Sequence, residues 1–144
     1  MAARRIRVGV IGVGRMGERH CRVYANLGNV ELVGISDLSV SRGRRIADAY
    51  GVSFYEDFTD LLGMVDAVSV ATPTDSHLTI AAECLRRHVH VLVEKPLASN
   101  QAEATEVLSM ARRSAAVLQV GHVERFNPVF LELQSIVEVL QIVA

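Results

Sequence analysis

Short apolar runs alternate with longer amphipathic segments along this chain. The runs are rich in valine and isoleucine, which is typical of strands buried on both faces of a sheet. Because the connecting segments are too long for hairpins and carry helix-capping residues, the pattern predicts an α/β fold: βαβ units, a doubly wound parallel sheet of about six strands and helices on both faces. The expected strands are residues 6–11, 30–36, 52–55, 65–71, 89–93 and 117–120, and the expected helices are residues 18–27, 40–50, 57–62, 77–87 and 101–113.

Composition narrows the class of protein. The 144 residues correspond to about one domain, and 50% of them are hydrophobic, which is enough for a sizeable core. A formal net charge of −1 gives no reason to expect a nucleic-acid or anionic-membrane partner. No apolar run reaches the ~20 residues that span a bilayer, and the N-terminus lacks the apolar segment of a signal peptide, so we expect a cytoplasmic protein. Cys21 and Cys84 have no partners at metal-ligand spacing, which predicts buried free thiols and no metal site.

The first expected strand runs without a break into a glycine-rich turn. Gly12, Gly14 and Gly17 form the pattern G-x-G-x-x-G, and the residues after them predict a helix. Strand, turn and helix in this order indicate a dinucleotide-binding site. The first glycine permits the turn, the second lets the backbone approach a pyrophosphate, and the third lets helix and strand pack closely. Because the N–H groups of the first helical turn then face the phosphates, the expected cofactor contacts here are Gly12, Val13, Gly14, Arg15, Met16 and Gly17.

An acidic residue after the second expected strand supports this interpretation. Asp37 lies ~20 residues past the glycines, where a carboxylate binds the ribose hydroxyls of NAD. The same charge would repel the 2′-phosphate of NADP, so NAD is the expected cofactor and NADP the less favoured one. Arg42 is close enough in the sequence to touch the adenosine ribose. In the alternative interpretation, the glycines only form a turn and Asp37 only caps the next helix.

The remaining candidates follow the later strands. The segments 72–77, 94–96 and 121 onwards each come directly after an expected strand. Because ligands bind at the carboxyl ends of the strands in an open α/β sheet, we expect these polar residues around one cofactor site. Lys95 is the only lysine among the 15 basic residues. Lysine can lose its proton at an attainable pH and arginine effectively cannot, which suggests a position that arginine would not serve.

Three motifs carry a resemblance to a known family. They are Gly12-x-Gly-x-x-Gly17, Thr72-Pro-Thr-x-x-His77 and Glu94-Lys-Pro96, of which the last is the most specific. Over residues 5–130 the chain resembles the N-terminal Rossmann domain of the glucose–fructose oxidoreductase/inositol dehydrogenase (Gfo/Idh/MocA) family. The segment 121–128 is similar to the version in members that oxidise sugar nucleotides, such as UDP-N-acetylglucosamine 3-dehydrogenases.

The resemblance implies a hydride transfer between a sugar-like alcohol carbon and nicotinamide C4. Lys95 would hydrogen-bond the reacting oxygen, stabilise the developing alkoxide and help to pass its proton. Glu94 would orient Lys95, and Pro96, which in this family often follows a cis bond, would fix the turn. The expected contacts on the cofactor side are Thr72, Pro73, Thr74, His77, Glu94 and Lys95, and those on the substrate side are His122, Arg125 and Asn127.

Structural alternatives remain open for several of these residues. Lys95 could be a solvated lysine at a strand end, and His77 could only extend a helix cap. Glu94 could be a structural partner for Arg125. His20 lies in the first expected helix, away from the phosphates, and receives no role.

The resemblance also divides the chain. Residues 1–128 would form the NAD(P)-binding domain, and residues 129–144 would form a helix and a strand (137–143) leading into an α+β substrate domain that this chain lacks. That second domain would supply the general base, so we expect NAD binding with little or no turnover. The expected substrate is a sugar or sugar nucleotide, and the full-length form is expected to be a homo-oligomer. A stand-alone NAD-binding regulatory module without catalysis is the alternative.

Overall fold

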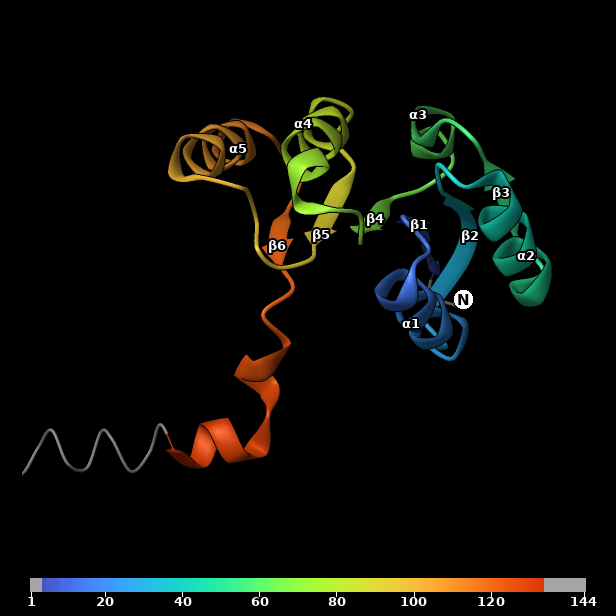
Figure 1. The fold of residues 1–144 in the computed structure, drawn as a ribbon, viewed down its shortest axis with the longest axis horizontal. Helices are drawn as coiled ribbons and strands as arrows, with labels where there is room; N and C mark the ends of the chain where they lie inside the picture. The colour runs from blue at the N-terminus through green and yellow to red at the C-terminus, as the bar shows by residue number, and fades with distance from the viewer. Residues whose placement is uncertain (1–3, 134–144) are drawn as a thin grey trace, which may run out of the picture.

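The computed structural model describes residues 4–133, and its centre is a six-stranded parallel sheet (Figure 1). The strand order is β3-β2-β1-β4-β5-β6, so the chain starts in the middle of the sheet and extends it first to one side and then to the other. This order confirms the predicted doubly wound sheet. The strands are β1 Ile6–Ile11, β2 Val30–Ser36, β3 Ser53–Tyr55, β4 Ala67–Val70, β5 His90–Val93 and β6 Leu118–Val120.

Helices cover both faces of the sheet, as predicted. Figure 1 shows α1 and α2 on one side and α3, α4 and α5 on the other. The first helix begins at Arg15 rather than at residue 18, because the last part of the glycine motif itself forms the first helical turn. The helices are α1 Arg15–Ala25, α2 Val40–Tyr50, α3 Phe58–Leu62, α4 His77–Arg86 and α5 Gln101–Arg113, and the 3-10 turns are η1 Thr74–Ser76 and η2 Val123–Phe126.

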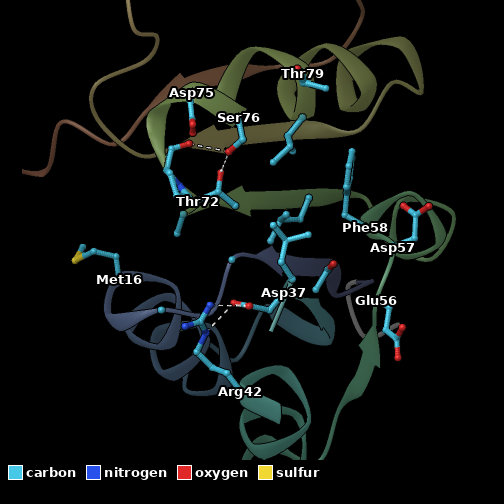
Figure 2. Close-up of a pocket in the computed structure, with 18 of the residues that line it drawn as sticks. Met16, Asp37, Arg42, Glu56, Asp57, Phe58, Thr72, Asp75, Ser76 and Thr79 are labelled. Carbon is cyan, nitrogen blue, oxygen red and sulfur yellow. Dashed lines mark hydrogen bonds and ion pairs between the residues drawn. The ribbon is translucent and has the colours of Figure 1, made fainter. Parts of the chain in front are cut away.

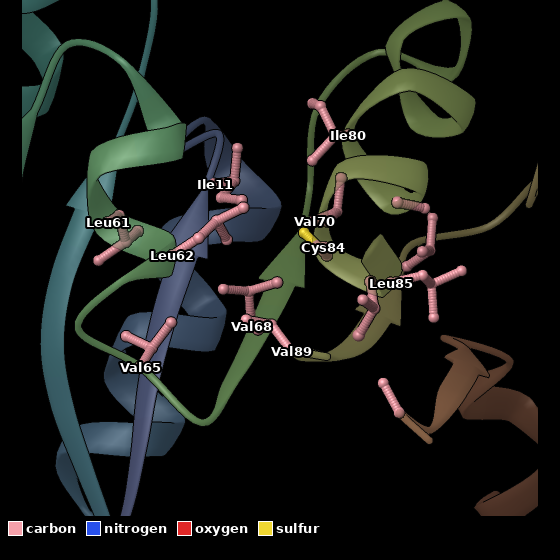
Figure 3. Packing of buried hydrophobic residues seen from close by; sticks show 14 of the residues in the cluster. Ile11, Leu61, Leu62, Val65, Val68, Val70, Ile80, Cys84, Leu85 and Val89 are labelled. Carbon is pink, nitrogen blue, oxygen red and sulfur yellow. The ribbon is translucent and has the colours of Figure 1, made fainter. Parts of the chain in front are cut away.

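Alternating strand side chains divide the core into two layers. Val10 in β1 packs with residues of α1 and α2, whereas its neighbour Ile11 packs with residues of α3 and α4. Figure 3 shows this second layer, in which Cys84 lies close to Val70. Cys21 lies in the first layer, and burial raises the pKa of both cysteine thiols to about 12. Both cysteines are free and buried, as predicted.

The helices differ in whether a side chain caps their N-terminal N–H groups. At α2, Ser39 accepts a hydrogen bond from the first turn, and Gly51 ends the helix in the left-handed conformation. At α5, Asn100 accepts a hydrogen bond of 3.0 Å from the N–H of Glu103. Gly14 precedes α1, and no side chain among the described residues caps that helix. The N–H groups of its first turn therefore remain available for another partner.

Beyond β6 the chain leaves the sheet (Figure 1). The turn η2 is followed by helical residues 128–133, which agrees with the predicted helix starting near residue 129. Phe126 and Phe130 in this segment are 74% and 55% exposed. The predicted strand at 137–143 lies outside the described residues. Within residues 4–133, every helix is too short or too polar to cross a membrane.

Asp66, just before β4, ties the amino ends of neighbouring strands together. Its carboxylate accepts hydrogen bonds from the backbone N–H and the guanidinium of Arg7, both at 2.9 Å, and pairs with Arg4 at 2.7 Å. The hydrogen bonds from Arg7 lower the pKa of Asp66 to about 2. Because this folded-state pKa is below the unfolded value of ~3.9, the interaction stabilises the fold above that value and is lost as the pH falls towards 2.

We predict that Asp66→Asn destabilises the fold at neutral pH and that the difference from wild type disappears in acid. Denaturant unfolding at a series of pH values measures it. The difference in unfolding free energy should be constant above about pH 5 and shrink steadily below about pH 4. Asp48→Asn is the matched control, because the exposed Asp48 carboxylate has no hydrogen bond or ion pair in the described part of the chain. A difference that is the same at every pH would show that the substitution acts through packing rather than charge.

Candidate dinucleotide-binding site

A cavity of about 1310 Å³ lies along the carboxyl ends of the central strands. Its walls come from the turns after β1, β2 and β4 and from the start of α3 (Figure 2). Met16, Asp37, Phe58 and Thr72, which are far apart in the sequence, border the same space. This is the edge at which the sequence predicted a ligand site. The predicted cofactor residues that line the cavity are Gly12, Gly14, Arg15, Met16, Asp37, Arg42, Thr72 and Pro73.

The three glycines differ in what surrounds them. Gly12 has a φ of +82°, a left-handed conformation that residues with a side chain rarely adopt. A Cβ at Gly17 would lie 1.8 Å from the carbonyl oxygen of Gly12, so only glycine lets α1 cross the turn this closely. A Cβ at Gly14 would meet nothing within 4 Å, and this open space borders the cavity. With the uncapped N–H groups of α1 beside it, the turn fits a diphosphate group.

Asp37 is buried at the tip of β2, where it connects the glycine-rich turn to α2. Its carboxylate accepts hydrogen bonds from the backbone N–H groups of Val13 at 2.8 Å and Ser39 at 2.7 Å. Arg42 adds two more, from Nε at 3.1 Å and Nη2 at 2.7 Å. Burial disfavours the charged carboxylate, but the hydrogen bonds from Arg42, Ser39 and Val13 outweigh it and hold the pKa of Asp37 below its ordinary value.

These contacts set how Asp37 could meet a ribose. Two carboxylate oxygens offer about four acceptor positions, and four donors already reach them. A ribose hydroxyl must therefore replace one donor, and the Arg42 side chain, which is 47% exposed, is freer to move than the two backbone groups. The alternative that Asp37 only caps the next helix accounts for its contact with Ser39 but not for its contacts with Val13 and Arg42. Val13 does not line the cavity, because its side chain is buried and its N–H is directed at Asp37, so a direct cofactor contact there stays a prediction.

His77 lies beneath the loop after β4 instead of facing the cavity. It is 1% exposed, and its Nδ1 and Nε2 atoms each lie 2.9 Å from a backbone carbonyl oxygen, of Pro96 and Thr72 respectively. The imidazole thus ties this loop to the turn after β5. His77 was expected either to contact the cofactor or to have a structural role, and these contacts are structural. A cofactor contact by His77 or Thr74, neither of which lines the cavity, stays a prediction.

The turn after β5 places Lys95 at the same edge of the sheet. Its peptide bond to Pro96 is cis, as the resemblance implied. Lys95 is exposed and does not line the cavity. Within residues 4–133, its side chain has no hydrogen-bond or ion-pair partner.

Glu94 is held by His20, a residue to which the sequence assigned no role. His20 Nε2 lies 2.8 Å from Glu94 Oε1, and the backbone N–H of Lys95 lies 3.3 Å from Oε2. The partner of Glu94 is therefore His20 and not Arg125. The sequence did not predict this contact, which forms because α1 brings His20 next to the end of β5. The two residues are 74 positions apart, and no local pattern signals such a contact.

The residues predicted on the substrate side lie at the start of the segment after β6. His122, Arg125 and Asn127 are all exposed, and none lines the cavity. Asn127 donates a hydrogen bond of 2.8 Å to Glu124, which stabilises the local turn. Their roles towards a substrate stay predictions. In the described residues, no group of histidine, cysteine, aspartate and glutamate side chains is arranged to hold a metal ion.

Comparison with known proteins decides the family. The model of the GFO_IDH_MocA family, described as "Oxidoreductase family, NAD-binding Rossmann fold", matches residues 6–122. The chain belongs to this oxidoreductase family. Membership confirms the NAD-binding Rossmann fold and the family resemblance that the three sequence motifs predicted.

Individual relatives match the chain over most of its length. UDP-N-acetylglucosamine 3-dehydrogenase of Acidithiobacillus ferrooxidans is 35% identical over 130 residues, covering 90% of this chain and 41% of that protein. Inositol 2-dehydrogenase 1 of Saccharopolyspora erythraea is 35% identical over 135 residues, with coverage of 90% and 40%. A solved structure of the Acidithiobacillus ferrooxidans enzyme has a TM-score of 0.86 at 34% identity and covers 92% of this chain and 44% of that chain. The chain thus spans about two fifths of the length of these relatives.

We predict that Gly17→Ala destabilises the fold by about 1–3 kcal/mol or more, because the new methyl group collides with a backbone oxygen rather than a movable side chain. Denaturant unfolding measures the loss. Gly28→Ala is the control: its Cβ would meet nothing within 4 Å, so its unfolding free energy should stay within about 0.5 kcal/mol of wild type. If Gly17→Ala were as stable as Gly28→Ala, the close crossing of α1 over the turn would be refuted.

Proposed function

We propose that this chain is the NAD-binding part of an oxidoreductase that transfers hydride between nicotinamide and a hydroxyl-bearing carbon of a sugar or sugar nucleotide. The observation that carries the proposal is one sheet edge that combines a turn shaped for a diphosphate with Lys95, whose side chain has no partner in the described part of the chain. The relatives named as UDP-N-acetylglucosamine 3-dehydrogenase and inositol 2-dehydrogenase support the substrate class.

In this proposal the first half of the chain holds the dinucleotide. The N–H groups at the start of α1 bind the diphosphate over Gly14, where no side chain intervenes. Asp37 accepts hydrogen bonds from the adenosine ribose after one contact of Arg42 gives way. NAD, when bound, supplies the hydride acceptor. Residues 1–128 form the cofactor domain, and residues 129–144 lead towards the part of the protein that binds the substrate.

Lys95 acts on the reacting oxygen of the substrate. Its ammonium group donates a hydrogen bond to that oxygen and stabilises the negative charge that develops there as hydride leaves the neighbouring carbon. Lys95 is exposed at the end of β5, and its side chain has no partner among residues 4–133, which leaves the amine free to do so. The proton that leaves the hydroxyl needs a base, which we place in the substrate domain. His122, Arg125 and Asn127 are proposed to contact the substrate from the segment after β6.

We predict that the chain binds NAD more tightly than NADP in calorimetric titrations. Gly14→Ala should weaken NAD binding about tenfold or more without changing the unfolding temperature, because its methyl group fills only the open space beside the helix N-terminus. Asp37→Asn should reduce the preference for NAD over NADP about tenfold, because it removes one charge that repels the 2′-phosphate. Equal binding of NAD and NADP by the wild type would contradict the role of Asp37. Unchanged NAD affinity in Gly14→Ala would place the diphosphate elsewhere.

Hydride transfer can be tested by joining residues 1–128 to the substrate part of the Acidithiobacillus ferrooxidans relative and following NADH formation with UDP-N-acetylglucosamine. We expect turnover, and we expect Lys95→Met to lower kcat by about 10²–10⁴-fold with little change in NAD affinity, because the lysine acts on the substrate oxygen. Lys95→Arg keeps the positive charge, but arginine effectively cannot release a proton. Its kcat should therefore lie between those of Lys95→Met and the wild type. NAD binding without turnover in the chimera would favour a regulatory module, and turnover unaffected by Lys95→Met would exclude the catalytic role.

A further inference from the structure

Glu94 and Lys95 are adjacent in the sequence and opposite in charge, yet their side chains do not pair. The Glu94 carboxylate turns inward, where its side chain is only 10% exposed and contacts His20 at 2.8 Å. The Lys95 side chain is exposed and has no partner in the described residues. The Glu94 carboxylate is therefore held in a position where it does not pair with the adjacent lysine.

A chain of hydrogen bonds explains what holds it. Ser69 in β4 is completely buried, and its hydroxyl lies 3.1 Å from His20 Nδ1. The hydroxyl of Tyr24, one turn after His20 in α1, lies 2.6 Å from the same serine oxygen. Two residues of α1, one of β4 and one at the end of β5 thus form a continuous polar path through the side of the sheet that α1 covers.

The directions of these hydrogen bonds follow from the donors and acceptors available. If Tyr24 donates to Ser69 and Ser69 donates to Nδ1, the neutral imidazole of His20 carries its proton on Nε2 and donates it to Glu94. In the reverse direction the hydroxyl proton of Tyr24 would have no acceptor within residues 4–133. Burial raises the pKa of Tyr24, which keeps its proton in place for donation. The path therefore presents a fixed N–H group to Glu94.

This arrangement favours the inward position of the carboxylate. A hydrogen bond to an ionised acceptor in a partly buried site is stronger than one in water. Glu94 receives a second, longer contact of 3.3 Å from the backbone N–H of Lys95. Swinging the carboxylate outward to the Lys95 amine would leave the N–H of His20 unpaired, which costs more than an exposed ion pair returns.

We propose that His20 is a positioning residue: supported by Ser69 and Tyr24, it keeps the Glu94 carboxylate from pairing with Lys95 and so leaves the Lys95 amine free. That the free amine is useful for hydride transfer rests on the proposed function. The restraint of Glu94 does not, because it is a property of this chain alone and can be measured without cofactor or substrate.

The only lysine of the chain makes the test specific. We would measure the rate at which Lys95 is acetylated by an activated ester at fixed pH, using mass spectrometry of the peptide that contains it and the N-terminal amine as an internal standard. Acetylation requires the neutral amine. An ion pair with a carboxylate favours the protonated ammonium group, so a paired lysine reacts more slowly than an unpaired one. The rate therefore reports whether Glu94 has moved to Lys95.

Two substitutions of His20 separate positioning from packing. A glutamine amide reaches about as far as Nε2 and can still donate to Glu94, whereas an asparagine amide reaches only about as far as Nδ1. We expect His20→Gln to react like wild type and His20→Asn to react about five- to tenfold more slowly. In a Glu94→Gln background, His20→Asn should have no further effect, because no carboxylate remains to be released.

Each outcome decides the proposal. An unchanged rate in His20→Asn, or an equal slowing in the Glu94→Gln background, would overturn it. If His20→Asn did not fold, Tyr24→Phe would serve instead: it removes only a hydroxyl and should slow acetylation two- to threefold, whereas Tyr50→Phe, which removes a hydroxyl outside the path, should not. A Tyr24→Phe rate equal to that of Tyr50→Phe would overturn it as well. Failure of the hydride-transfer assay leaves these rates unaffected, so the two proposals fail separately.

Discussion

The crossing of α1 over the glycine-rich turn is the contact on which the other features of this edge depend. A Cβ at Gly17 would lie 1.8 Å from the oxygen of Gly12, so the helix begins directly on the turn with no space between them. This position directs the N–H groups of its first turn into the cavity and brings the Val13 N–H within 2.8 Å of Asp37. It also carries His20, one helical turn further on, to the carboxylate at the end of β5. One steric requirement thus fixes the positions of the glycine-rich turn, Asp37 and the end of β5 relative to one another.

The parts that could be predicted from the sequence are those encoded locally. Each strand is an apolar run that can be recognised from its composition. The helices between these runs predict that the strands are parallel. The glycine motif and Asp37 are recognised by spacing, because the backbone geometry they serve spans only a few neighbouring residues. The start of α1 was placed three residues late, at 18 rather than 15, because a glycine-rich segment does not look helical by propensity.

The polar path through the sheet could not be predicted, because its contacts join residues 45 to 74 positions apart. One signal was available. Ser69 interrupts an otherwise apolar strand, and a buried hydroxyl is costly unless it is hydrogen-bonded. The serine therefore indicates that a partner must exist on that face of the sheet. Whether the partner is His20 or another residue depends on the angle at which α1 crosses the strands, which the sequence does not reveal.

Residues 4–133 form the cofactor end of the site more completely than the end that contains Lys95. At the cofactor end, backbone N–H groups and a buried carboxylate line a cavity that is already shaped, so affinity for a dinucleotide can reside in this part of the chain. At the other end, Lys95 is exposed to solvent, where a charge interacts several-fold more weakly with a developing alkoxide than in a water-excluded site. In the proposed function, the contribution of Lys95 therefore depends on excluding water from the end of β5. The proposed restraint of Glu94 would matter most in such a water-excluded site, because an adjacent carboxylate holds an ammonium group more firmly in a low dielectric than in water.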